Sequence, residues 1–253
     1  MSIKNASIAI FDSGLGGISV LRECMQLLPN EHFLYFGDSI NAPYGTKDKK
    51  QILDHCFSIC NFFMEKQVKA IVVACNTATS VAIDALRQRY PIPIIGMEPA
   101  LKLAAHNQKK KNIIVMATPL TLKEKKFAKL MKQYETNNNI IKMPCPHFVD
   151  IIEQDMDHKQ LHVNAQIDAY SHLIKNIDSI VLGCTHFLFL KKEIQHYFDN
   201  NIVIFDGNLG TARNLKAILE SKNLLSHHTG GVQIYNSDVS KIKLSKKLAG
   251  VKV

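Results

Sequence analysis

The chain has 253 residues, 46% of them hydrophobic, and a formal net charge of +9 at pH 7. This length and composition provide for a substantial buried core in one large or two small domains, and we favour two. No apolar run approaches the roughly 20 residues that cross a bilayer, and the first residues lack the basic and apolar regions of a signal peptide, so we expect a soluble cytoplasmic protein without a membrane partner.

Hydrophobic periodicity predicts strands and helices that alternate along the first part of the chain. In chain order, the expected elements are strand Ser7–Phe11, helix Leu15–Leu28, strand His32–Phe36, helix Lys49–Lys66, strand Ala70–Ala74, helix Thr77–Tyr90 and strand Ile92–Ile95. Such alternation is typical of parallel sheets that are covered by helices.

The same alternation starts again after Gly96. The expected elements are strand Asn112–Ala117, helix Thr121–Tyr134, strand Ile140–Lys142, helix Val149–Gln154, helix Leu161–Ile174, strand Ser179–Leu182, helix Leu188–Phe198, strand Ile202–Phe205, helix Thr211–Glu220 and strand Val232–Tyr235. The restart predicts an α/β protein of two similar lobes, each with a mainly parallel sheet flanked by helices. We assign residues 1–97 and 208–253 to the first lobe and residues 98–207 to the second.

Two of the predicted strands, one in each lobe, end in a cysteine followed by polar residues. The two segments are Val72-Val73-Ala74-Cys75-Asn76-Thr77 and Val181-Leu182-Gly183-Cys184-Thr185-His186. Unpaired N–H groups and the helix dipole stabilise a thiolate at a helix N-terminus. Because ligands bind beyond the carboxyl ends of parallel strands, we expect Cys75 and Cys184 to face one substrate in a cleft between the lobes.

Further polar residues lie at the same strand ends. The first strand runs into Asp12-Ser13-Gly14-Leu15-Gly16-Gly17, which matches neither the dinucleotide-binding nor the P-loop pattern. We therefore expect this turn to bring backbone N–H groups close to a carboxylate, with Asp12 free to orient a thiol or to accept from an ammonium group. His186 follows Cys184 so closely that it is a candidate acid-base partner of the thiol.

The other cysteines have a simpler interpretation. Without a secretory signal, six cysteines indicate reduced thiols and no disulfide framework. Cys24, Cys56, Cys60 and Cys145 fall on predicted helix faces or beside proline, and we interpret them as core residues. Cys56 and Cys60 share a helical face without a completing ligand set, so we expect no metal site.

The positive charge is spread along the chain. Lysines concentrate in three separate segments, Lys109–Lys111, Lys123–Lys132 and Lys241–Lys252, while arginine is scarce and no RNP-like or zinc-finger pattern occurs. We therefore expect no nucleic-acid partner. The charge would still favour the encounter with an anionic substrate.

The chain resembles glutamate racemases, which belong to a cofactor-independent amino-acid racemase superfamily that also includes aspartate racemases. The resemblance covers residues 8 to about 220 and rests on five ordered blocks: Phe11-Asp12-Ser13-Gly14-Leu15-Gly16-Gly17, Gly37-Asp38-Ser39, Ala42-Pro43-Tyr44-Gly45, Val73-Ala74-Cys75-Asn76-Thr77-Ala78 and Gly183-Cys184-Thr185-His186-Phe187. Two departures are visible, Leu188 in place of the family's usual proline and Asp206-Gly207-Asn208 in place of Asp-Ser-Gly. Neither removes a base.

The resemblance implies that L- and D-glutamate are interconverted by two bases without a cofactor. Cys75 would deprotonate D-glutamate while Cys184 protonates the opposite face, with the roles exchanged for L-glutamate. Asp12 and His186 would tune or orient Cys75 and Cys184, respectively, and Glu153 would support the second wall of the site. The implied substrate contacts are Asp12, Ser13, Tyr44, Gly45, Asn76, Thr77, Thr118, Thr121, Thr185 and His186.

The resemblance further implies a homodimer and a product, D-glutamate, that is used in bacterial peptidoglycan. Two alternatives stay open. One is a racemase for aspartate or for several amino acids, since the two-thiol machinery is common to the superfamily. The other is a non-catalytic binding or regulatory protein of the same fold, which the loss of one cysteine would favour, whereas this chain has both.

Overall fold

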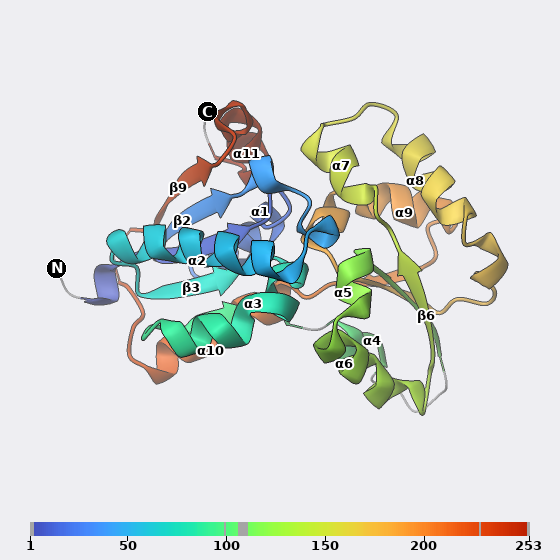
Figure 1. Ribbon diagram of the computed structural model, residues 1–253, viewed down its shortest axis with the longest axis horizontal. Coiled ribbons are helices and arrows are strands. Elements are labelled where there is room, and N and C mark those ends of the chain that lie inside the picture. Colours follow the sequence, from blue (N-terminus) through green and yellow to red (C-terminus); the bar gives the residue numbers. More distant parts are fainter. Residues whose placement is uncertain (1–2, 99, 106–110, 228, 252–253) are drawn as a thin grey trace.

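The predicted alternation of strands and helices folds into two parallel sheets (Figure 1). The first sheet has the order β4-β3-β1-β2-β9 and the second the order β6-β5-β7-β8, and the neighbouring strands of both run parallel. The strands are β1 (Ile8–Asp12), β2 (His32–Gly37), β3 (Ala70–Val73), β4 (Ile94–Gly96), β5 (Asn112–Ala117), β6 (Asn139–Pro144), β7 (Ser179–Leu182), β8 (Val203–Phe205) and β9 (Gly231–Asn236). The predicted α/β fold class is confirmed.

The computed structural model describes residues 3–98, 100–105, 111–227 and 229–251. Lys109, Lys110 and Lys252, which belong to the lysine-rich segments above, lie outside this range. Within it, no helix is both long enough and apolar enough to cross a membrane.

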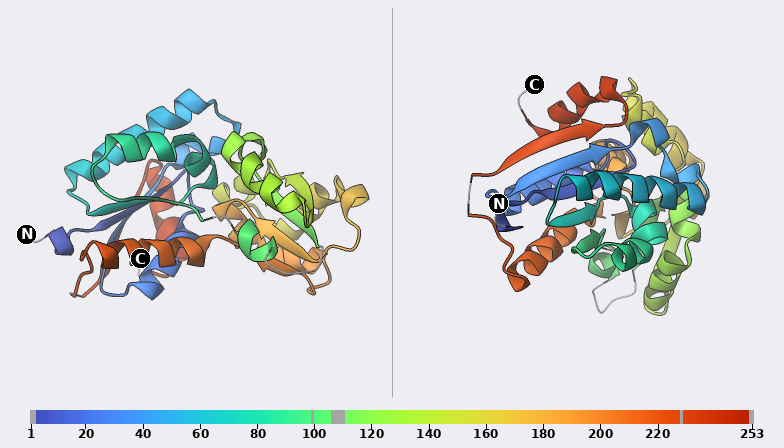
Figure 2. Two further views of the ribbon diagram at one scale, coloured as in Figure 1. Left: turned by 90° about the horizontal axis from the view of Figure 1, so that it is seen from below. Right: turned by 60° about the vertical axis from the view of Figure 1, so that its left-hand side comes forward.

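Helices flank both sheets (Figures 1 and 2). Those around the first sheet are α1 (Ile18–Leu27), α2 (Lys49–Glu65), α3 (Asn76–Arg89), α10 (Asn208–Ser221) and α11 (Ile242–Ala249), and those around the second are α4 (Leu101–Ala105), α5 (Pro119–Lys123), α6 (Lys125–Glu135), α7 (Phe148–Glu153), α8 (Lys159–Asp168) and α9 (Lys191–Tyr197). Short 3₁₀ helices are η1 (Ile3–Asn5), η2 (Ser39–Asn41), η3 (Tyr44–Thr46), η4 (Ser171–Leu173), η5 (Thr185–Leu190) and η6 (Val239–Lys241).

The central strand β1 shows why the sheets are sandwiched between helices. All of its residues are buried, and Ile8 and Ile10 join one hydrophobic cluster while Ala9 and Phe11 join another. Because side chains alternate between the faces of a strand, the two clusters lie on opposite sides of the sheet. A strand that is covered on both faces has a nearly continuous apolar sequence, as β1, β3 and β7 do.

The chain returns to its first sheet near its C-terminal end. Strand β9 pairs in parallel with β2, with His32 opposite Gly231 and Gly37 opposite Asn236. The helix α10 that precedes β9 packs on α1. The division into residues 1–97 with 208–253 and residues 98–207 stays a prediction.

Three predicted helices differ from those of the structure. Helix Thr121–Tyr134 is divided into α5 and α6 because Glu124 has an extended backbone, with φ −65° and ψ 132°. Helix Leu161–Ile174 ends at Asp168 and is followed by η4, and helix Leu188–Phe198 is replaced by η5 and α9. Two further helices, α4 and α11, were not predicted. Helix α11 is short and lysine-rich, and it is followed by Gly250, whose φ of 72° is left-handed.

Candidate active site

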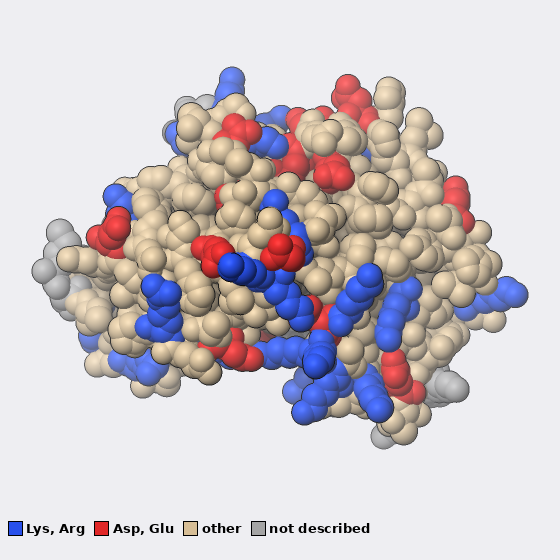
Figure 3. Space-filling model, in the orientation of Figure 1, with Lys and Arg blue, Asp and Glu red and all other residues tan. Residues whose placement is uncertain are grey.

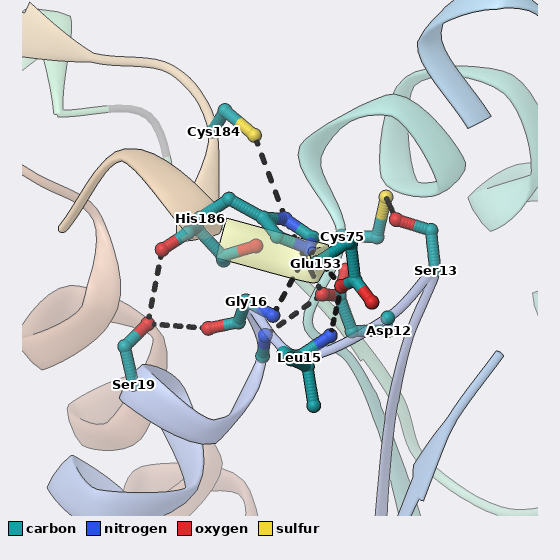
Figure 4. Close-up of polar contacts among 12 residues, drawn as sticks. Asp12, Ser13, Leu15, Gly16, Ser19, Cys75, Glu153, Cys184 and His186 are labelled. Carbon is teal, nitrogen blue, oxygen red and sulfur yellow. Dashed lines mark hydrogen bonds and ion pairs between the residues drawn. The ribbon is translucent and has the colours of Figure 1, made fainter. Parts of the chain in front are cut away.

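The carboxyl ends of the parallel strands bring polar side chains from both lobes together. Strand β1 ends in Asp12, its neighbour β3 is followed by Cys75, and β7 of the second sheet is followed by Cys184. The two cysteines lie on opposite sides of a polar network that contains Asp12, Glu153 and His186 (Figure 4). Both thiols are buried, with 5% of Cys75 and 8% of Cys184 exposed.

Cys75 is the N-cap residue of α3. Its Sγ accepts a hydrogen bond from the Ala78 N–H at 3.4 Å and lies 3.7 Å from the Ser13 hydroxyl. Burial raises the pKa of the Cys75 thiol and the charge of Asp12 raises it further, while the Ala78 N–H acts in the opposite direction. The helix N-terminus therefore opposes part of the cost that burial imposes on the thiolate.

Cys184 has a different environment. It precedes η5, a 3₁₀ helix, and accepts no capping hydrogen bond through its side chain. Instead its Sγ lies 3.9 Å from Nδ1 of His186. The expected N-terminus of an α-helix is therefore present at Cys75, whereas Cys184 precedes a 3₁₀ helix and contacts an imidazole instead.

His186 joins Cys184 to two buried carboxylates. Its Nε2 lies 2.7 Å from Oε1 of Glu153, and its Nδ1 lies 3.8 Å from Oδ2 of Asp12. Burial lowers the pKa of His186, but the contacts with Cys184 and Glu153 and the charge of Asp12 outweigh this effect and hold the pKa well above its ordinary value of 6.5. The structure thus favours an imidazolium at this position.

The two carboxylates differ in their proton affinity. Burial raises the pKa of Asp12, against the opposing effect of His186. For Glu153, burial also acts upward, but the hydrogen bond and charge of His186 prevail and hold the pKa below its ordinary value. Of these two carboxyl groups, Glu153 is therefore the one that the structure favours in its anionic form.

The glycine-rich turn after β1 lies against these groups. The Leu15 N–H donates to Oε1 of Glu153 at 2.6 Å, so the turn brings a backbone N–H group to a carboxylate of the protein itself. A Cβ at Gly14 would lie 2.0 Å from the same oxygen, and one at Gly16 would lie 2.3 Å from Nδ1 of His186. This close approach requires glycine at both positions.

The two carboxylate oxygens of Asp12 have different surroundings. Its Oδ2 accepts from the Gly17 N–H at 2.8 Å. Its Oδ1 is buried and has no hydrogen-bond partner among the residues that the structure describes. An unpaired buried acceptor is costly and marks a position where a donor of a bound molecule would be stabilised.

Three threonine hydroxyls meet where the two lobes touch. Oγ1 of Thr77, at the start of α3, lies 3.1 Å from Oγ1 of Thr118 and 3.0 Å from Oγ1 of Thr121, and the latter two are 2.9 Å apart. Thr118 is the N-cap residue of α5. The structure therefore groups three of the predicted substrate contacts into one cluster of hydroxyls.

The remaining predicted contacts lie around this core of the site. Asn76 and Thr121 line a cavity of about 410 Å³ between α3 and α6. Thr185 is buried, and its Oγ1 would lie 2.6 Å from a Cβ at Gly16. Tyr44 donates its hydroxyl to Oδ2 of Asp38 at 2.7 Å, so this side chain stabilises its own loop.

Gly45, another predicted substrate contact, lies beside Thr118. A Cβ at Gly45 would lie 2.6 Å from Cβ of Thr118, so Gly45 is packed against the hydroxyl cluster.

The other four cysteines are buried free thiols, namely Cys24, Cys56, Cys60 and Cys145. Burial raises the pKa of Cys24 and Cys60 to about 12. In the described part of the chain, no group of three or more His, Cys, Asp or Glu side chains is arranged to hold a metal ion.

One contact of the site had no signal in the sequence. The Nζ atom of Lys241, in η6, donates to the backbone carbonyl of Glu153 and lies 3.4 Å from its Oε2. Lys241 stood out in the sequence only as the first of the C-terminal lysines. Its place beside Glu153 depends on how β9 and η6 return to the first sheet.

Comparisons with known proteins agree with this geometry. The family model for Asp/Glu/Hydantoin racemase matches residues 15–215. A glutamate racemase of Clostridium botulinum (strain Alaska E43 / Type E3) is 48% identical over 256 residues, covering 98% of each chain. One of Bifidobacterium animalis subsp. lactis is 49% identical over 241 residues, covering 93% of each chain.

Solved structures give the same result. The glutamate racemase isoform RacE1 of Bacillus anthracis has a TM-score of 0.86 at 27% identity, covering 99% of this chain and 96% of the other. The glutamate racemase of Francisella tularensis in complex with D-glutamate has a TM-score of 0.84 at 29% identity with the same coverage. This chain is therefore an isomerase, an amino-acid racemase that belongs to the Asp/Glu/Hydantoin racemase family and matches its glutamate racemases along its length.

Proposed function

We propose that this protein interconverts L- and D-glutamate by a two-base mechanism in which Cys75 and Cys184 act on opposite faces of the α-carbon. The observation that carries the proposal is the pair of buried thiols on opposite sides of one network, each with its own partner. Inversion requires that a proton leaves one face of the α-carbon and another arrives at the opposite face. Two thiols, one ionised and one protonated, meet this requirement in both directions.

On the second lobe, His186 ionises Cys184. Nε2 of His186 lies 2.7 Å from the Glu153 carboxylate and 3.2 Å from the Gly16 N–H. We assign the proton of Nε2 to the shorter, charged contact with Glu153, which leaves Nδ1 to accept the thiol proton of Cys184. The product of this transfer is a thiolate beside an imidazolium, and the anionic Glu153 stabilises the imidazolium. Cys184 is then the base for L-glutamate.

On the first lobe, the helix N-terminus stabilises the thiolate of Cys75. The Ala78 N–H and the Ser13 hydroxyl contact Sγ, and both strengthen as charge develops on sulfur. In the reaction of L-glutamate, the C–H bond breaks toward Cys184, its electron pair is delocalised into the α-carboxylate, and Cys75 delivers its proton to the other face. The roles of the two thiols are reversed for D-glutamate.

Preorganised polar groups would hold the substrate during this transfer without a cofactor. Oδ1 of Asp12 is a buried acceptor without a partner in the described part of the chain, and it is suited to the α-ammonium group. The hydroxyls of Thr77, Thr118 and Thr121 and the N–H groups at the start of α3 are donors suited to carboxylates. The remaining contacts would be Ser13, Gly45, Asn76 and Thr185, whereas Tyr44 would act through its loop.

Glutamate is the best supported substrate. The Francisella tularensis structure is described with D-glutamate and an Escherichia coli glutamate racemase structure with L-glutamate. The positive charge of the chain also favours an anionic substrate, because basic side chains gather over α6 (Figure 3), where Lys126 and Lys129 line the cavity that Asn76 and Thr121 share. By the same relationship, the enzyme would be a cytoplasmic homodimer that supplies D-glutamate for peptidoglycan.

Proton NMR of L-glutamate in D₂O with the purified protein, combined with chiral analysis, tests the proposal. We expect the α-proton signal to disappear while D-glutamate forms, without an added cofactor. Turnover of aspartate at a comparable rate would instead identify a racemase of broad specificity. The absence of exchange with glutamate, aspartate and other amino acids would contradict the proposal and favour a binding protein.

A further inference from the structure

The segment that follows β9 reaches across to the second lobe. Lys241 is the last residue of η6, directly before α11, and its side chain is only 20% exposed. Its Nζ atom donates to the backbone carbonyl of Glu153, the last residue of α7, and lies 3.4 Å from Oε2 of the same residue. In Figure 1 the ends of α11 and α7 lie close together at the top of the molecule.

The charges of the site explain why a lysine is useful at this position. Asp12, Glu153 and His186 are all buried and form one contact chain. With both carboxylates ionised and His186 protonated, the three groups carry a net charge of −1. A net charge that is buried in protein is costly, and its usual remedy is the uptake of a proton or a counter-charge. The Lys241 ammonium supplies a counter-charge.

We propose that Lys241 is a positioning residue of the reaction: it holds Glu153 in place, and its positive charge lowers the proton affinity of both Glu153 and His186, the partner of Cys184. This inference rests on the proposed function. Oε1 of Glu153 is occupied by Leu15 and His186, and Lys241 binds the two remaining acceptors, Oε2 and the backbone carbonyl. All the oxygens of Glu153 are then fixed, and the imidazole is fixed with them.

The sign of the effect follows from Coulomb's law. A nearby cation disfavours protonation of every group around it, so the removal of the Lys241 charge raises the pKa of both His186 and Glu153. The other groups that face this pair are Asp12 from β1, Tyr35 from β2, Cys184 before η5 and the hydroxyl of Ser39 in η2. They are unchanged in a Lys241 variant, so a shift would report the lost ammonium.

The variants Lys241→Met, Lys241→Gln and Lys241→Arg separate charge from hydrogen bonding. Glutamine retains a donor without charge, and arginine retains both. Lys243→Met is the matched control, because Lys243 is an exposed lysine two residues further along the chain. Melting temperatures of all four show whether the fold is kept, and the glutamine variant replaces the methionine variant if the latter does not fold.

The direct readout is NMR titration of His186 in protein labelled with ¹³C at the histidine Cε1, assigned with a His186→Asn sample. In Lys241→Met and Lys241→Gln we expect the midpoint to move to higher pH by about half a unit or more, with Lys241→Arg and Lys243→Met close to wild type. An unshifted midpoint would overturn the proposal whether or not activity changes.

Kinetics then show whether the shift matters for the reaction. We expect kcat/KM of Lys241→Met to fall about fivefold or more. The limb of its pH profile that reports His186 should move to higher pH, as the NMR midpoint does. In Lys241→Arg we expect both kcat/KM and this limb to be close to those of wild type. Loss of activity without displacement of that limb would contradict a role through His186. If wild-type protein did not racemise glutamate, the proposed function would fail, whereas the NMR titration would still test the charge coupling.

Discussion

The surroundings of the two thiols both favour a thiolate, but they do so through different interactions. Cys75 on the first lobe is held by backbone and hydroxyl dipoles, at the first turn of the 14-residue helix α3. Cys184 on the second lobe lies beside a titratable group, His186, which is connected to Glu153, Asp12 and Lys241. One side therefore offers fixed partial charges, while the other offers a proton acceptor.

A reaction that is symmetric in its substrates therefore does not need a symmetric site. The helix N-terminus cannot accept a proton, so it only stabilises the thiolate once formed. The imidazole stores a proton and so couples Cys184 to the pH of the solution. We expect pH to act mainly on the Cys184 side.

The replacement of either cysteine removes one of the two thiols and has the largest expected effect on racemisation. In Cys75→Ser and in Cys184→Ser, racemisation should fall by about 10³-fold or more, because one face loses its acid or base. The fold should be retained, since serine is close in size to cysteine. Activity assays with circular dichroism as the folding control measure both.

The same variants show which face each thiol serves. In D₂O, Cys75→Ser retains Cys184 and should exchange the α-hydrogen of L-glutamate but not that of D-glutamate. Cys184→Ser should show the reverse preference. Equal exchange of both enantiomers by one variant would contradict the assignment of faces.

The variant His186→Asn removes the imidazole beside Cys184 and leaves the contacts of Cys75 in place. We expect kcat/KM to fall about 100-fold, because the thiol loses its proton acceptor. The loss should be the same for both substrates, since the equilibrium constant between enantiomers is one. The primary deuterium isotope effect should rise more with α-deuterated L-glutamate than with D-glutamate, and a larger rise with D-glutamate would contradict the pairing of His186 with Cys184.

Ser13→Ala weakens only the Cys75 side. The hydroxyl lies 3.7 Å from Sγ, so its loss should lower kcat/KM about tenfold, the magnitude of one hydrogen bond to a charged group. The Ala78 N–H remains in place and limits the effect. Because the Ser13 hydroxyl lowers the pKa of the Cys75 thiol, steady-state kinetics over a range of pH should show the limb that reports Cys75 displaced to higher pH and the limb that reports His186 unchanged.

The smallest expected effect concerns stability. The pKa of His186 is raised in the folded protein, so its contribution is fully present below 6.5 and is lost as pH rises through the folded pKa. The pKa of Glu153 is lowered, so its contribution is fully present above 4.5 and is lost as pH falls through the folded pKa. Both contributions are complete between pH 4.5 and 6.5.

The variant Glu153→Gln tests this window. Relative to wild type, we expect its free energy of unfolding to be lower by about 1 kcal/mol or more within the window, and the difference to shrink at more acidic and more alkaline pH. Urea titrations at a series of pH values measure it. A difference that stays constant with pH would show that the His186–Glu153 pair does not stabilise the fold by charge.

The sequence predicted the parallel sheets well because their strands are short apolar runs with turn residues at the ends. Ser179–Leu182 and Asn112–Ala117 match β7 and β5 residue for residue. Local pattern did not reveal the break at Glu124, because its extended backbone lies within a periodic stretch. It also missed α11, in which lysines surround a narrow apolar stripe.

The site was predicted unevenly for a similar reason. Cys75, Cys184 and His186 carry local signals, namely a thiol after an apolar strand and a histidine two residues later. Their roles differ because α3 begins immediately after Cys75 whereas η5 follows Cys184, a distinction that depends on packing. Lys241 comes to Glu153 across 88 positions of sequence, through the return of β9, and no local pattern contains that information.

The most direct test of two thiols on opposite faces is the isotopic content of each enantiomer early in the reaction. L-glutamate is incubated briefly with the enzyme in D₂O, and the enantiomers are separated and analysed by mass spectrometry. The two-base account predicts deuterium at the α-carbon of the D-glutamate formed and hydrogen retained in the L-glutamate that remains. D-glutamate that carries the hydrogen of its substrate would show that a single base moves the proton, and would contradict the account.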